Sequence, residues 1–78
     1  MSELEEKRVY LAQADRHIAE GETRIADQVA LIARLKKDGH DLNLARDFLH
    51  VLVGTLAQWN VHRQLILNRI AQLTTPEP

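Results

Sequence analysis

The sequence contains no cysteine, and its 78 residues include only two prolines, three glycines and three aromatic side chains. Without cysteine, disulfide frameworks and thiolate metal sites are excluded. Both prolines lie within the last three residues, so no proline before Pro76 interrupts a helix. A chain of this length forms one domain at most, near the size at which a single core barely offsets the entropy lost on folding.

Charge of either sign is not in excess, because 10 Lys and Arg residues face 11 Asp and Glu residues. A protein that binds the nucleic-acid backbone is normally clearly basic, so no nucleic-acid partner is expected. The most apolar segment, residues 48–57, is too short to cross a bilayer, which takes roughly 20 apolar residues. Residues 1–8 are charged and contain no apolar run typical of a signal peptide. We therefore expect a cytoplasmic protein with no membrane partner.

The few helix-ending signals in the chain divide it into two long helices. Ser2 followed by Glu5 is typical of a capping box at a helix N-terminus. The basic residues before Gly39 suit the negative end of a helix dipole, and glycine tolerates the left-handed conformation that often follows a helix. These signals predict a first helix over about residues 3–38 and a turn over residues 39–41.

The second helix is predicted over residues 41–74. Asp41 is a good N-cap for it, with Asn43 as the alternative. Pro76 disfavours helical geometry in the residue before it, which leaves residues 75–78 as a frayed tail. Two helices of similar length joined by a tight turn predict an all-α fold, an antiparallel two-helix hairpin that resembles a coiled coil.

A seven-residue repeat runs through both helices and predicts the face on which each packs against the other, here called the seam. Its apolar character is interrupted most clearly by Arg63 on the second helix. The seam positions on the first helix are Leu4, Lys7, Leu11, Ala14, Ile18, Gly21, Ile25, Gln28, Ile32 and Leu35, and those on the second are Leu42, Ala45, Leu49, Leu52, Leu56, Trp59, Arg63, Ile66, Ile70 and Leu73.

A tight turn predicts which seam residues lie opposite each other. In the predicted register, Gly21 faces Trp59 and Ile25 faces Leu56. Space for an indole would explain a glycine in a helix interior, where it costs about 1 kcal/mol relative to alanine. A local kink at Gly21 is an equally good interpretation. Arg63 is expected to bend towards Asp15 or Glu22.

The second helix also carries apolar residues outside the seam, in a second stripe at three-four spacing. The second stripe consists of Leu44, Phe48, Val51, Thr55, Gln58, His62 and Leu65. An antiparallel partner helix covers only one face, so this stripe would be an exposed patch of the kind that marks an interface. We therefore expect a homo-oligomer, with a dimeric four-helix bundle favoured over a trimer or tetramer. A different helical protein covering the stripe is the alternative.

Catalytic patterns are lacking in this sequence. It has no cysteine nucleophile, glycine-rich phosphate loop or nucleophile elbow, so we expect a protein that is not an enzyme and has no cofactor. A metal-binding bundle is an alternative function, because His17 and Glu20 share one helical face and His62 falls level with His17 in the predicted register. The favoured interpretation is a small interaction or scaffold module without a metal.

Three short motifs give the chain a recognisable pattern. They are the segment His-Ile-Ala-Glu-Gly-Glu at residues 17–22, the Gly-His-Asp turn at 39–41 and the His-Arg pair at 62–63. Over residues 11–70, the chain resembles a group of very short bacterial helical proteins with this pattern. The resemblance implies a bacterial origin and brings no activity, substrate or cofactor with it.

Overall fold

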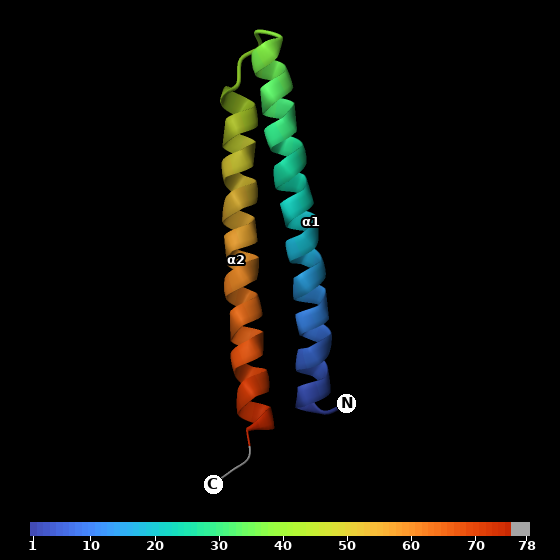
Figure 1. Ribbon diagram of the computed structural model, residues 1–78. Helices are drawn as coiled ribbons and strands as arrows, with labels where there is room; N and C mark the ends of the chain where they lie inside the picture. The colour runs from blue at the N-terminus through green and yellow to red at the C-terminus, as the bar shows by residue number, and fades with distance from the viewer. Residues whose placement is uncertain (76–78) are drawn as a thin grey trace.

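The structure, a computed structural model, describes residues 1–75 and consists of two antiparallel α-helices, α1 (Glu3–Lys37) and α2 (Asn43–Thr74) (Figure 1). No strand occurs among these residues. The prediction of an all-helical chain whose two helices pack against each other is confirmed. Of the predicted tail, residues 76–78 lie outside the described residues.

The helix ends follow from local side-chain and backbone chemistry. The Ser2 hydroxyl accepts a hydrogen bond from the Glu5 amide at 3.2 Å, as a capping residue does. Gly39 adopts a φ of 78°, and the amide of His40 donates to the Leu35 carbonyl at 2.9 Å. The amide of Gly39 donates to the Lys36 carbonyl at 3.2 Å, which completes a Schellman motif.

The connection between the helices is longer than predicted. The first helix ends at Lys37 instead of residue 38, and the second begins at Asn43 instead of residue 41. The predicted N-cap is wrong, because Leu42 holds that position without a side-chain cap, in place of Asp41 or Asn43. Oδ1 of Asp41 instead accepts from the Asn43 amide at 2.9 Å. The side chain of Asp41 thus forms a turn of its own before the helix begins.

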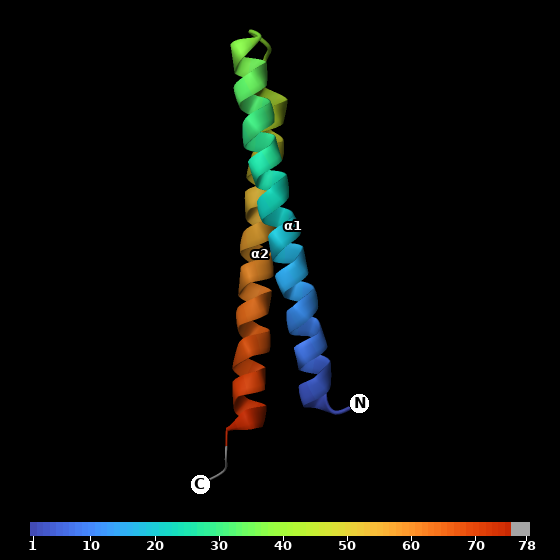
Figure 2. The same ribbon diagram turned by 45° about the vertical axis from the view of Figure 1, so that its right-hand side comes forward.

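The hairpin is a narrow rod. Its principal extents are 64 × 18 × 14 Å and its radius of gyration is 18.0 Å, whereas a compact domain of this length has a radius of about 11–12 Å. The two helices run side by side in Figure 1, and in Figure 2 α1 passes in front of α2 near the turn. Such a shape leaves a large surface relative to the volume enclosed.

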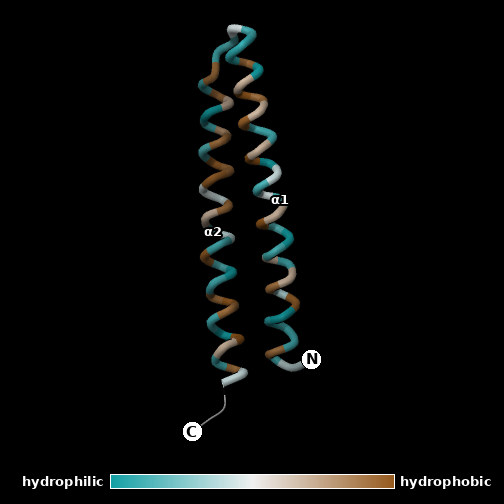
Figure 3. The backbone as a smooth tube through the Cα atoms, viewed as in Figure 1, coloured by the Kyte–Doolittle hydropathy of each residue, from teal (hydrophilic) through white to brown (hydrophobic). Residues whose placement is uncertain are grey.

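Every described seam position is buried or half-buried. Ala14 and Ile66 are the buried apolar residues, and no large side chain within residues 1–75 is fully buried. Hydrophobic residues recur along the facing sides of both helices (Figure 3). Two helices therefore form a contact strip and lack a core with several layers.

The predicted register is wrong by about one helical turn. A Cβ placed on Gly21 would lie 3.4 Å from Leu56 Cδ1, with no atom of Trp59 within 4 Å. The indole of Trp59 instead stacks on the imidazole of His17, with ring centroids 4.3 Å apart. Gly21 therefore accommodates Leu56, which the prediction had placed against Ile25.

Two polar seam residues find partners across the hairpin. Gln28 is only 8% exposed, and its amide nitrogen donates to the Ala45 carbonyl at 2.9 Å. Arg63 reaches out of the seam to Asp15, with 2.6 Å between Nε and Oδ1, as the sequence predicts for one of its two candidate partners. Both polar groups are satisfied, so neither weakens the seam by leaving a buried group unpaired.

Candidate interaction surface

The second stripe lies in the open along one flank of the hairpin. Its apolar members remain largely accessible, with exposed fractions of 83% for Leu44, 52% for Phe48, 60% for Val51 and 62% for Leu65. Thr55, Gln58 and His62, which lie between them, are also exposed. The hairpin therefore leaves all seven residues of the stripe available to a partner.

The first helix widens this apolar flank near the turn. Leu31 of α1 and Leu44 and Phe48 of α2 line a groove of about 610 Å³. Gln28, Leu35, Asp41 and Ala45 complete the lining. A concave, mostly apolar surface of this kind is typical of a site that receives apolar side chains.

An aromatic cluster occupies the same flank further from the turn. Trp59 is stacked on His17, with an interplanar angle of 20°, and meets His62 edge-on, with ring centroids 5.5 Å apart. Gln58, Trp59 and His62 line a second, shallower hollow of about 320 Å³. The half-buried Trp59 therefore borders a hollow beside two residues of the second stripe, Gln58 and His62.

An ion pair lies on this flank beyond the last residue of the second stripe. Arg69, four residues after Leu65, donates to both carboxylate oxygens of Glu3 at 2.6 and 3.0 Å. This hydrogen bonding, opposed by a smaller desolvation effect, holds the pKa of the Glu3 carboxyl below its ordinary value. The same pairing raises the pKa of Arg69. No sequence signal singled out this pair, since it depends on the register of the two helices.

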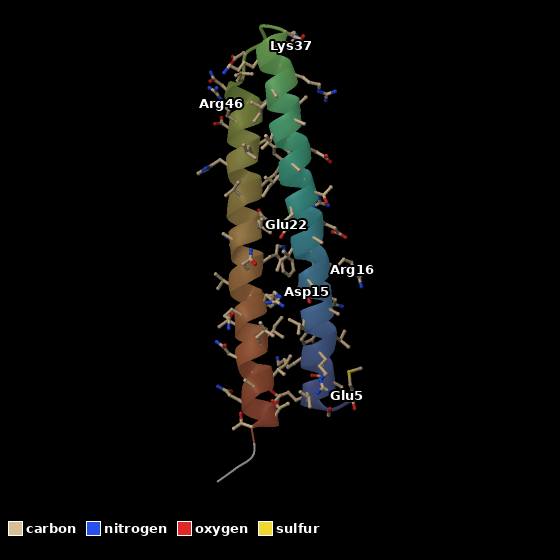
Figure 4. All side chains as sticks on the ribbon, viewed as in Figure 1. Glu5, Asp15, Arg16, Glu22, Lys37 and Arg46 are labelled. Carbon is tan, nitrogen blue, oxygen red and sulfur yellow. The ribbon has the colours of Figure 1, made fainter. Side chains whose placement is uncertain are left out.

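Charged and apolar side chains also lie outside the second stripe. Asp15 lies on the inner side of α1, where it pairs with Arg63, while Arg16 points away from α2 (Figure 4). Val29 and Val53 are exposed apolar residues outside the second stripe. Residues two apart on a helix point about 200° away from each other, so Val53 and Val51 lie on opposite sides of α2.

The three candidate metal ligands do not converge. His17 Nδ1 lies 3.8 Å from Glu20 Oε2, but the ring of Trp59 is in contact with both His17 and His62. Among residues 1–75, no group of three or more His, Cys, Asp or Glu side chains is arranged to hold a metal ion. His17 and His62 thus pack with Trp59 in an aromatic cluster, and they do not form a metal-binding site with Glu20.

No family model, curated protein or solved structure matches the chain. Neither helix within the described range combines the length and apolar character needed to cross a bilayer.

Proposed function

We propose that this protein is a self-assembling helical module, in which two hairpins pair through the second stripe and form a four-helix bundle. The observation that carries the proposal is the exposure of Leu44, Phe48, Val51 and Leu65 along one flank of a hairpin that lacks a core. Burial of apolar surface is the main driving force of protein association. Pairing would give each hairpin the second layer that it lacks.

The surface area of the hairpin supports an interface of the size of a stable dimer. The chain exposes 6054 Å². A compact protein of 8.9 kDa exposes about 4,800 Å², so the excess is about 1,200 Å². A standard interface covers about 800 Å² on each partner. Contact over such an area along the second stripe would lower the exposed area per chain to about 5,250 Å², which removes about two-thirds of this excess.

The chemistry of the stripe favours a second copy over a different protein. A two-fold interface brings the same patch together on both subunits, so a patch that carries one sign of charge would repel itself. The second stripe contains no Asp, Glu, Lys or Arg between Leu44 and Leu65. Arg69, which follows the stripe, is already paired with Glu3. Self-association therefore meets no charge barrier along the contact.

The role that follows is structural and not catalytic: pairing holds two copies of the chain in one rigid assembly. A different helical protein that covers the same stripe is the competing hypothesis. Sedimentation of the purified protein distinguishes the two, because only self-association raises the mass in the absence of other proteins.

The test compares two aspartate variants of α2. Val51→Asp places a charge in the second stripe, and Val53→Asp places it on the other side of the helix, at a residue of the same type with comparable exposure (60% and 48%). We expect sedimentation equilibrium to give a dimer for the unmodified chain and Val53→Asp, and a monomer or unfolded chain for Val51→Asp. A monomeric unmodified chain, or an unchanged dimer for Val51→Asp, would refute the proposal.

A further inference from the structure

We infer that the two hairpins pair antiparallel, with Phe48 of each copy packed into the hollow beside Trp59 and His62 of the other. This inference rests on the proposed self-association and adds its orientation and register. It follows from the positions of the two hollows on the apolar flank. One is the groove at Leu31, Leu44 and Phe48 near the turn, and the other lies at Gln58, Trp59 and His62.

The two hollows lie at different heights along the rod, on either side of Thr55. When a second copy is turned end for end about an axis through Thr55, the turn-proximal residues of one α2 meet the distal residues of the other. Three-four spacing then sets the partners of the stripe. Leu44 meets Leu65, Phe48 meets His62 and Val51 meets Gln58 of the second copy.

Each hollow then faces a projecting apolar side chain. Phe48, which is about half exposed, reaches the hollow beside Trp59 of the second copy. Leu65, which is 62% exposed, reaches the groove at Leu31 and Leu44. The aromatic contact is chemically suited, since phenyl, indole and imidazole rings pack well edge-on or offset. The same two insertions repeat on the other side of the two-fold axis.

A parallel pair would leave these hollows unfilled. With both turns at one end, each residue of the stripe meets its own copy, so the hollow at Trp59 faces another hollow. Empty space at an interface forfeits dispersion contacts on both sides. A parallel pair would also stack three consecutive polar layers, in which Thr55, Gln58 and His62 each meet the same residue of the other copy. The antiparallel arrangement fills the hollows, leaves Thr55 alone of these three facing its own copy, and opposes the dipoles of the two α2 helices.

Cysteine cross-linking tests the orientation without a background, because the natural chain has no cysteine. Thr55→Cys lies at the proposed two-fold axis, so oxidation should give covalent dimers of this variant in high yield. Leu44→Cys alone should give at least tenfold less, because its partner is Leu65. An equimolar mixture of Leu44→Cys and Leu65→Cys copies, re-equilibrated before oxidation, should give the cross-linked heterodimer. Val53→Cys, on the opposite side of α2, serves as the control for random collisions.

The outcomes separate this inference from the proposed function. Efficient self-linking of Leu44→Cys would establish parallel pairing and overturn the inference while leaving self-association intact. A dimer in which Thr55→Cys does not link above the level of Val53→Cys would also overturn it, because the axis would then lie elsewhere. A monomer by sedimentation would instead refute the proposed function. Trp59 is the single tryptophan, so its emission should shift to longer wavelength on dissociation by dilution.

Discussion

Replacing Phe48 with alanine removes the largest apolar side chain of the second stripe. Phe48 is 52% exposed in the single hairpin. A phenylalanine buries 150–250 Å² when covered, so about 100 Å² remains for an interface, worth about 2.5 kcal/mol. Alanine retains a small part of this, which leaves a loss of about 2 kcal/mol per copy and about 4 kcal/mol per dimer. The dimer Kd should therefore rise by roughly three orders of magnitude.

Sedimentation equilibrium over a range of concentrations measures this change, and circular dichroism checks that both proteins remain helical at the same concentration. Val29→Ala is the matched control: Val29 is 51% exposed, but it lies two residues before Leu31 and so points to the other side of α1. We expect the dimer Kd of Val29→Ala to stay within about threefold of the unmodified value. The two methyl groups that this change removes lie outside the proposed interface, so their loss should not affect association. A Phe48→Ala dimer as tight as that of Val29→Ala would refute the reasoning.

Two further predictions concern the hairpin itself. Gly21→Ala should raise the free energy of unfolding by about 0.5–1 kcal/mol, because alanine favours helix and its Cβ would meet Leu56 at an ordinary contact distance. Thermal unfolding measures this change, and a Tm below that of the unmodified chain would show that the helices approach too closely for a Cβ. The pKa of Glu3 is lowered by Arg69, so the stabilisation from this pair is present at neutral pH and is lost as the pH falls below 4.5 and through the lowered pKa. The protection factors of amides near the start of α1, which compare exchange with the intrinsic rate at each pH, should therefore fall on acidification, and in Glu3→Gln they should be low already at neutral pH.

The faces of the two helices could be predicted because a seven-residue repeat is a local property of the sequence. Each position of the stripe is fixed relative to its neighbours by helix geometry alone, without knowledge of the partner. Arg63 could be assigned in the same way, since a cation in an apolar seam must reach outward to an acid such as Asp15. The two-helix architecture was also predictable, because few helix-breaking residues lie outside the turn and the last three residues.

The register could not be obtained from the same pattern. In a repeat of alternating three and four residues, sliding one helix along the other by three or four residues again brings apolar seam positions opposite each other. Several registers therefore satisfy the pattern about equally well. The actual offset depends on the path that the connection takes between the helices, in which Asp41 makes a side-chain turn just before α2. This is why Trp59 was placed against Gly21 and not against His17.

The second stripe was accessible from sequence, whereas the hollows beside it were not. Leu44 and Phe48 belong to a single helix, and their spacing alone indicates an apolar patch. The groove at Leu31 and the aromatic cluster of His17 with Trp59 combine residues from both helices. Such features exist only once the register is known, so sequence reasoning identified the patch without its shape.

Both ends of the hairpin, the start of α1 and the finish of α2, lie at the same tip of the rod, and the turn lies at the other (Figure 1). In an antiparallel pair, these open tips point in opposite directions along a body whose single-copy length is 64 Å. Anything attached at the open tip of either copy would be held apart from its counterpart by a stiff strut. The assembly would then act as a spacer that sets a fixed distance between two attachments.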